Sequence, residues 1–258
     1  MKNQYFGDLN DFRKIGLIRS LTGFGRLSTA VCWMLTPDDT TTDGKFIDYL
    51  QQPDKYRQLD PELFDKLKYY VSTAGERRVS AVDEGWILPS AKCYYEVLLD
   101  DAKDRSNYFQ SFWELAEGCD FIFFDPDNGM EVKSKPAGKT GSSKYLYWAE
   151  LVQAYSLGCS VLVYQSFRRT KRDEFIRQMA NEFISKTGAP EVYSFRTKLM
   201  ALFLLPSQAM SLTLDRNISL VEQTWFGELE VVRHSRSDTP MFNRLYVSNQ
   251  SGQDVFGS

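Results

Sequence analysis

The stretch CDFIFFDPDNGME, residues 119–131, decides the fold of this 258-residue chain. Residues 121–124 are all apolar, which is typical of a strand that is buried on both faces of a parallel sheet. The strand must stop at Asp125, because the proline that follows cannot donate a ladder hydrogen bond and the Asp, Asn and Gly residues after it favour a tight turn. Two carboxylates and a carboxamide, those of Asp125, Asp127 and Asn128, therefore lie where a hydrophobic strand ends.

A strand end of this kind is a common place for a binding site. In open α/β sheets, ligands bind in the crevice beyond the carboxyl ends of the strands. We therefore interpret Asp125, Asp127 and Asn128 as candidate catalytic residues, and Glu131 with the polar loop after it supports a site here. The alternative is a surface turn that is closed by hydrogen bonds from its own Asp and Asn side chains.

A second apolar segment repeats this pattern. Residues 28–35, STAVCWML, predict a buried strand that runs through a proline into Asp38 and Asp39. Because the carboxyl ends of parallel strands meet at one edge of a sheet, we expect Asp38, Asp125 and Asp127 to line one acidic pocket. Asp38 is accordingly a candidate for substrate binding. The alternative is a flexible acidic loop.

A third apolar segment, CSVLVY at residues 159–164, predicts another buried strand that ends in polar residues. We place Gln165 and Ser166 at the substrate site for this reason. Four cations follow within five residues, just before a helix predicted for residues 173–186: Arg168, Arg169, Lys171 and Arg172. Cations oppose the preference of a helix N-terminus for anions, so we expect these residues to bind a phosphate. The alternative is a solvated basic turn.

The first helix is predicted to begin at Asp8, which can cap it. Its apolar face consists of Phe12, Ile15, Leu17, Ile18 and Leu21. Asp8, Asp11 and Lys14 follow one another at intervals of three residues, so they share a different face of the helix. We interpret Asp8 and Lys14 as lining the site. The alternative is a capped helix with one local ion pair, which contributes little.

The loop KSKPAGKTGSSK, residues 133–144, is rich in lysine, glycine and serine. Lysines and free backbone N–H groups attract anions, so Lys144 is a further candidate for substrate binding. The loop is not a Walker A motif, because the pattern G-x-x-x-x-G-K-[ST] is absent. A solvated loop is the alternative.

Apolar strands alternate with helices along most of the chain. Further helices are predicted at residues 105–117 and 145–155, and either two strands or one long bent strand within residues 191–206. This alternation predicts an α/β fold, a three-layer sandwich with a mainly parallel, Rossmann-like sheet. No repeat, heptad or linker divides the sequence, so we predict a single domain over residues 1–247 and a frayed tail over residues 248–258.

Two regions are less well defined by their patterns. Residues 76–82 favour a strand, and Asp60 before a proline favours the start of a helix. Residues 207–247 mix apolar and charged positions without a clear period, so they do not separate strand from helix.

Composition limits the class of protein. The chain is 43% hydrophobic and 14% aromatic, enough to build a core, and its net charge of −3 means that any contact with nucleic acid must come from a local basic patch. No apolar run has transmembrane length and no secretory pattern begins the sequence, so we expect a cytoplasmic protein with no membrane partner. Four dispersed cysteines suit a reducing compartment, and the single histidine, His234, does not favour a zinc site.

Two stretches resemble bacterial adenine-N6 ribosomal-RNA methyltransferases. Residues 7–14, GDLNDFRK, resemble the opening helix of these enzymes, and Asp125-Pro126 resembles their catalytic turn, D-P-P-[YF]. The resemblance implies S-adenosylmethionine as the cofactor. It also implies that Asp125 accepts a hydrogen bond from the target amino group, and that Asp8 and Lys14 line the cofactor pocket.

The chain departs from the pattern of these methyltransferases at two places. Asp127-Asn128 replaces the second proline and the aromatic residue of the catalytic turn. Residues 36–39, TPDD, stand where a glycine-rich cofactor loop would allow the backbone to approach its ligand.

The uracil-DNA-glycosylase superfamily provides a second resemblance. Its first motif is a strand that runs into an Asp-Pro turn, where a carboxylate orients the attacking water, and Asp125-Pro126 is similar to this turn. A later motif of that superfamily is a strand that runs into a His-Pro-Ser loop, which steadies the leaving base. The strand that ends at Gln165-Ser166 occupies the corresponding place, although Ser166 is not a histidine.

The leading hypothesis is a hydrolase of the DNA glycosylase kind that acts on an extruded nucleotide without a cofactor or a metal. Asp125 or Asp127 would orient water against the N-glycosidic bond, and Asn128 would read the edge of the base or align the water. Three cations would hold the phosphates: Arg168, Arg169 and Arg172. The expected partner is nucleic acid, with DNA favoured over RNA.

Three other functions stay open on the sequence alone. The first is an S-adenosylmethionine-dependent nucleic-acid methyltransferase. The second is a nuclease in which Asp125, Asp127 and Glu131 hold Mg²⁺. The third is a nucleic-acid-binding module without catalytic activity. The sequence does not define the target base or the oligomeric state.

Overall fold

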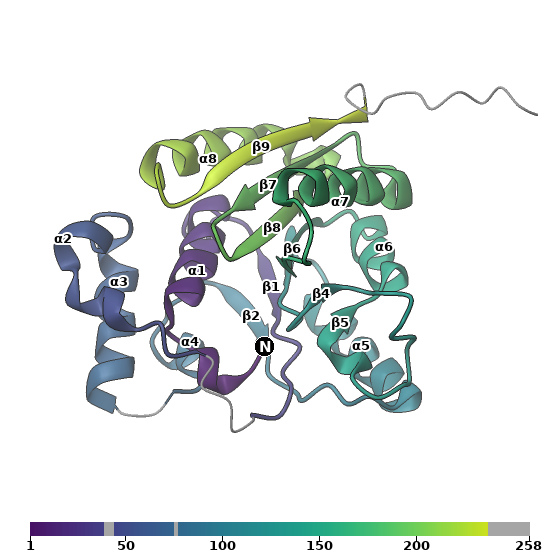
Figure 1. The fold of residues 1–258 in the computed structure, drawn as a ribbon, viewed down its shortest axis with the longest axis horizontal. Helices are drawn as coiled ribbons and strands as arrows, with labels where there is room; N and C mark the ends of the chain where they lie inside the picture. Colours follow the sequence, from purple (N-terminus) through teal and green to yellow (C-terminus); the bar gives the residue numbers. More distant parts are fainter. Residues whose placement is uncertain (39–43, 75–76, 237–258) are drawn as a thin grey trace, which may run out of the picture.

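A seven-stranded sheet forms the centre of the protein in a computed structural model that describes residues 1–38, 44–74 and 77–236 (Figure 1). In spatial order the strands are β2 (Ala91–Tyr94), β1 (Thr29–Cys32), β3 (Phe121–Phe124), β6 (Ser160–Ser166), β8 (Met200–Leu205), β7 (Glu191–Arg196) and β9 (Glu230–Ser235). The first four strands pair in parallel, whereas β8 runs antiparallel to both of its neighbours and β9 antiparallel to β7.

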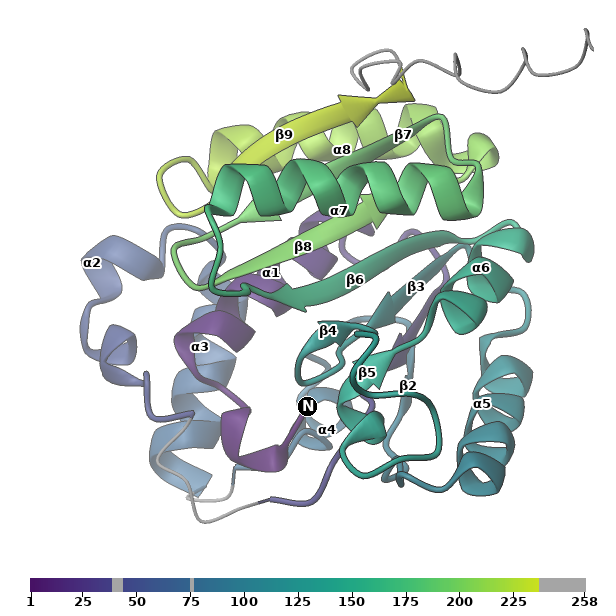
Figure 2. The same ribbon diagram turned by 45° about the vertical axis from the view of Figure 1, so that its right-hand side comes forward.

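Helices cover both faces of this sheet (Figure 2). One face packs against α1 (Leu9–Leu21), α3 (Pro61–Tyr69) and α8 (Ser211–Thr224), and the other against α5 (Ala102–Ala116), α6 (Trp148–Ser156) and α7 (Arg172–Thr187). Alternate residues of each central strand enter the two separate apolar clusters, as the period of a strand requires. The predicted three-layer α/β sandwich with a mainly parallel sheet is confirmed.

Short elements complete the fold. They are α2 (Pro53–Tyr56), α4 (Ala81–Glu84), a two-stranded sheet of β4 (Gly129–Met130) and β5 (Tyr145–Leu146), a π-helix at Tyr70–Ala74, and 3-10 turns at Asn3–Tyr5, Asp48–Gln51, Ser142–Lys144 and Gln208–Met210. Within the described residues, no helix is long and apolar enough to cross a membrane.

Side-chain caps fix the starts of several helices. The carboxylate of Asp8 accepts a hydrogen bond from the backbone N–H of Asp11 at 2.9 Å, and that of Asp60 accepts one from Leu63 at 3.0 Å. Both caps agree with the sequence predictions. Asp101 caps α5, so that helix begins three residues earlier than the predicted Arg105.

Two regions differ from the sequence-based expectation. The strand expected at residues 76–82 is a short helix, Ala81–Glu84, in the part that the structure describes. Within residues 207–247, α8 buries Leu214, Ile218 and Val221 at helical spacing, and β9 follows as an edge strand. Because β9 carries exposed charges on both faces, its sequence lacks the alternation of apolar and polar residues that would predict a strand. The tail over residues 248–258 lies outside the described residues.

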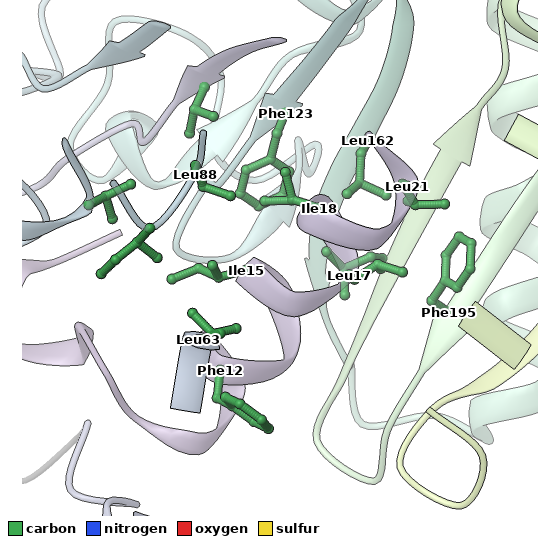
Figure 3. Packing of buried hydrophobic residues seen from close by; sticks show 14 of the residues in the cluster. Phe12, Ile15, Leu17, Ile18, Leu21, Leu63, Leu88, Phe123, Leu162 and Phe195 are labelled. Carbon is green, nitrogen blue, oxygen red and sulfur yellow. The ribbon is translucent and has the colours of Figure 1, made fainter. Parts of the chain in front are cut away.

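The first helix is largely buried, and it contacts both α3, from the N-terminal part of the chain, and α8, from the C-terminal part. Its apolar residues belong to one cluster, in which Ile18 lies beside Phe123 of the sheet, Leu17 faces Phe195, and Phe12 lies near Leu63 of α3 (Figure 3). A neighbouring part of the helix contacts α8, where the buried Trp225 lies against Gly16 and its indole N–H reaches the Ser20 hydroxyl at 3.4 Å.

This close contact gives a test of the packing. A methyl group added at Gly16 would lie 2.2 Å from the buried ring of Trp225, which has no room to move away. We expect Gly16→Ala to lower the free energy of unfolding by roughly 1–3 kcal/mol, although alanine is the better helix former. Urea unfolding measures this, with Ser219→Ala on the exposed side of α8 as the control. An unchanged or higher stability of the Gly16 variant would contradict this packing.

Candidate functional site

The candidate site lies at the carboxyl ends of β1 and β3. The strand order reverses between these two strands, because β2 lies on one side of β1 and β3 on the other, and ligands of open α/β sheets bind at such a reversal. The backbone N–H of Asp125 donates to the carbonyl of Cys32 at 3.0 Å, which joins the two strand ends. The Asp-Pro turn is therefore held firmly at this edge.

Met1 is seated on the same edge. Its α-amino group donates to the carbonyls of Asp125 at 3.0 Å and Met34 at 3.2 Å, and it pairs with the Asp127 carboxylate at 2.7 Å. Met34 has a φ of +47°, a left-handed conformation that is uncommon for a residue with a side chain. The chain thus turns sharply directly after β1, where a glycine-rich loop would also turn.

Lys14 is the central cation of the site. It is buried, and its ammonium group lies 2.8 Å from Asp11 Oδ1 and 2.7 Å from Asp125 Oδ2. The same ammonium lies 5.2 Å from the centre of the Tyr164 ring. The first helix, the end of β3 and the end of β6 therefore meet around one buried charge.

These groups line a pocket of about 200 Å³. Its carboxylates come from Asp8, Asp11, Asp125 and Asp127, and its aromatic rings from Tyr5, Phe46 and Tyr164. Four carboxylates outnumber the two cationic groups, Lys14 and the Met1 amine, so the pocket favours a ligand with positive charge or hydrogen-bond donors. Asn10 also lines it, and the buried Asn10 Oδ1 has no hydrogen-bond partner among the described residues.

The carboxyl groups of the pocket differ in acidity. Burial raises the pKa of Asp11 to about 7, with the neighbouring carboxylates adding to the rise and Lys14 opposing it. Burial also raises the pKa of Asp127, but the Met1 amine and Thr36 outweigh it, so this pKa is lower than usual. Burial alone would lower the pKa of Lys14, yet the carboxylates of Asp11 and Asp125 raise it overall. Lys14 thus stays charged, whereas Asp11 can change its charge near neutral pH.

The prediction of one acidic pocket is met only in part. The turns after β1 and β3 lie on the same edge of the sheet, and Asp125 and Asp127 share the pocket as expected. Asp38 does not line it, because its side chain is exposed and accepts a hydrogen bond from the Gln4 backbone at 3.2 Å. Asp39 lies outside the described residues.

Gln165 and Ser166 contact the protein itself rather than the pocket, which corrects their placement at the substrate site. The Gln165 amide accepts from Met130 N–H at 2.8 Å and donates to the Asn128 carbonyl at 3.2 Å. The Ser166 hydroxyl donates to the same carbonyl at 2.7 Å. A side chain at Gly129 would collide with Gln165, which explains the glycine. Asn128 takes part through its backbone, so its predicted catalytic role gains no support from these contacts.

The loop over residues 133–144 binds an internal carboxylate. Asp100 accepts hydrogen bonds from the backbone N–H groups of Gly141 at 2.7 Å and Ser143 at 2.8 Å. The carbonyl of Lys144 accepts one from Asn128, and Lys144 does not line the pocket. The anion-binding N–H groups expected in this loop exist, but the protein's own Asp100 uses them.

The remaining candidates lie apart from the pocket. Glu131 accepts a hydrogen bond from the backbone N–H of Trp148 at 2.9 Å, so it caps α6 instead of joining Asp125 and Asp127. No group of three His, Cys, Asp or Glu side chains in the described ranges is arranged to hold a metal ion. Four predicted phosphate-binding cations are exposed around the start of α7: Arg168, Arg169, Lys171 and Arg172.

Asp11 is the main residue of the site that the sequence candidates omitted. Its spacing of three residues from both Asp8 and Lys14 placed it on the right face of the helix, but the pattern alone could not distinguish a pocket from a local ion pair. Tyr5, Phe46 and Tyr164 carried no comparable signal, because aromatic residues are common throughout the chain.

The raised pKa of Asp11 predicts a pH dependence of stability. The folded protein binds a proton at Asp11 more tightly than the unfolded chain, whose carboxyl has a pKa of about 3.8. Between about pH 4 and pH 7 unfolding releases this proton, so Asp11 makes stability fall as pH rises, by up to about 1.4 kcal/mol per pH unit. Asp11→Asn removes this contribution. Urea unfolding at several pH values measures this contribution, and the exposed Asp38→Asn is the control. If the free energies of unfolding of the wild type and Asp11→Asn change with pH in the same way, the assignment is wrong.

Comparisons with known proteins were made on the sequence and on the fold. No family model and no curated protein matches the chain. Among solved structures, it is similar to the crystal structure of protein LPL1258 from Legionella pneumophila str. Philadelphia 1, family-model DUF519, with 11% sequence identity and a TM-score of 0.49. The match covers 90% of this chain and 98% of that chain. A similarity of this size carries no inference about the function of this chain.

Proposed function

We propose that the protein transfers a methyl group from S-adenosylmethionine to an amino group of a nucleic-acid base. One observation carries this proposal: the two stretches that resemble adenine-N6 methyltransferases meet in one pocket, where Lys14 Nζ lies 2.7 Å from Asp125 Oδ2. These residues are 111 positions apart in the sequence. If the two resemblances were independent coincidences, nothing would bring the two stretches together in the fold.

The strand ends favour the resemblance to the methyltransferases, because the residues that carry it, Lys14 and Asp125, line the pocket. Uracil-DNA glycosylases, by contrast, draw their second motif from the next strand end, where the Gln165 and Ser166 side chains are engaged with backbone groups.

The pocket suits a cationic cofactor. The cofactor carries a sulfonium, an ammonium and a carboxylate group, for a net charge of about +1, and the pocket has more carboxylates than cations. Asp8 and Asp11 would face this positive charge, Asn10 Oδ1 would accept a hydrogen bond, and Tyr5 and Phe46 would contact the flat base. When bound, S-adenosylmethionine supplies an electrophilic methyl group.

Asp125 would act on the amino group of the target base. Its carboxylate would accept a hydrogen bond from that group, orient the nitrogen lone pair and favour loss of the proton. Lys14 is a positioning residue in this scheme, because its ammonium lies 2.7 Å from Asp125 Oδ2 and fixes the carboxylate in place. Asp11, with its pKa of about 7, is suited to take up a proton near neutral pH.

The compartment is the second part of the proposal. The four cysteines, three of them buried, are all free of disulfides. Free buried thiols suit the reducing cytoplasm, where nucleic acids are also found.

Isothermal titration with S-adenosylmethionine and its demethylated product tests cofactor binding directly. Mixed DNA and RNA are then incubated with the protein and the cofactor and analysed by mass spectrometry. A gain of one methyl group on a base is the expected result. The absence of heat with both compounds would overturn the methyltransferase proposal.

The role of Asp125 leads to a specific prediction. Asp125→Asn keeps the shape of the side chain and leaves Lys14 paired with Asp11, so we expect a folded protein that still binds its ligands. Its turnover falls by about 10²–10⁴, because the charge that acts on the amino group is lost. Asp38→Asn, an exposed change after β1, is the matched control and keeps normal turnover. A folded Asp125→Asn protein with undiminished turnover would refute the catalytic role.

Hydrolysis of an N-glycosidic bond is a second candidate, favoured by a separate observation. The pocket contains two carboxyl groups of opposite character, Asp11 with a raised pKa and Asp127 with a lowered one. Enzymes that cleave glycosidic bonds use such a pair, one group as the acid and the other as the carboxylate. The same mass spectrometry separates the candidates, since hydrolysis releases a free base without any cofactor.

A further inference from the structure

A second, wider cleft of about 1290 Å³ also borders the first helix. It is formed by the turn between β7 and β8, the start of α7, the segment before β9, and Arg13 of α1. Neither candidate reaction uses this cleft, and its side chains are mostly charged.

The acidic side chains of the cleft are largely neutralised by ion pairs. Glu228 pairs with Arg13 and with Lys55, and Arg196 pairs with both Asp173 and Glu230. Among the described residues, three lining cations have no ion-pair partner: Lys171, Arg172 and Lys198. Of the lining acids, Glu222 alone has no ion-pair partner among the described residues. The charge that remains available to a ligand is therefore positive.

An aromatic ring stands in the same cleft. Phe226 is 85% exposed, which is costly for a phenylalanine in a soluble protein. Its position is fixed, because the neighbouring Trp225 is fully buried and Gly227 closes the turn with a φ of +83°. The backbone N–H groups of Glu228 and Leu229 both donate to the Trp225 carbonyl at 3.0 Å. The fold thus fixes the backbone that carries this exposed apolar ring, in a cleft that also holds unpaired cations.

We infer that this cleft binds single-stranded nucleic acid. Cations in a groove track the phosphates of a single strand, and an exposed aromatic ring stacks on its bases, which are hidden from such contact in a duplex. Lys171, Arg172 and Lys198 supply the phosphate contacts, and Phe226 supplies the stacking surface.

The cleft also lies in the right place for this task. Arg13 lines the cleft and its neighbour Lys14 lines the pocket, so both sites border the same turn of the first helix. A strand held in the cleft can therefore extend one unstacked base into the pocket. This arrangement rests on the proposed function, because it assigns the cleft the polymer whose base the pocket would modify.

Binding is measured without cofactor, by fluorescence anisotropy with labelled single-stranded DNA, single-stranded RNA and duplex DNA of about 16 nucleotides. We expect single strands to bind more tightly than the duplex, and the DNA and RNA arms identify which polymer is preferred. The double variant Lys171→Gln/Arg172→Gln lowers the slope of log K against log salt by about 1.4, since each single-strand phosphate contact contributes about 0.7. Phe226→Ala weakens binding about 10-fold, and Phe226→Tyr keeps it.

Lys103→Gln/Lys186→Gln is the matched control, because both lysines are exposed and lie outside the cleft. It leaves the salt slope unchanged. Equal binding by wild type and both cleft variants, preferential binding of the duplex, or no binding at low salt would overturn the inference. If the protein methylates a free nucleoside but binds no oligonucleotide, the inference about the cleft is wrong and the methyltransferase proposal stands. Oligonucleotide binding that depends on Phe226, without heat on cofactor titration, would refute only the methyltransferase proposal.

Discussion

The buried ion pair between Lys14 and Asp125 is the interaction on which the site depends. Removing a lysine and two carboxylates from water is costly, and the cost is offset only when the charges meet in good geometry. Lys14 satisfies this condition by bridging Asp11 and Asp125 at 2.8 and 2.7 Å. It follows that the first helix cannot shift along the sheet without leaving a buried charge uncompensated, so the pair fixes the register of the helix as well as the form of the pocket.

The fold was largely readable from the sequence because its central strands are buried on both faces. Such strands form continuous apolar runs, and residues 121–124 and 200–205 are of this kind. The edge strand β9 was not readable, since a strand that faces water carries charges that hide its period. Helix starts were readable where an aspartate caps them, as at Asp8 and Asp60, because the cap is a local interaction.

The candidate site was predictable only in part, and the reason is that side-chain partners are set by tertiary contacts. The sequence placed Asp125 and Asp127 at a strand end, but it could not tell that Gln165 would contact the Asn128 carbonyl. A polar residue after a strand can face a ligand or the protein's own backbone, and both outcomes give the same local pattern. The Gly-Ser loop is a similar case, because its N–H groups bind Asp100 from a distant segment.

The contact between the first helix and Trp225 has a consequence for how the protein is made. Trp225 Nε1 and Ser20 are 205 residues apart, and Asp125 lies 111 residues beyond Lys14. A ribosome releases the first helix long before the segments that cover its apolar side exist. During synthesis this helix exposes Phe12, Ile15 and Leu17, and the nascent chain is open to aggregation until α8 emerges. Closing such long loops late also makes folding slow, so we expect the chain to depend on chaperones more than its size alone would require.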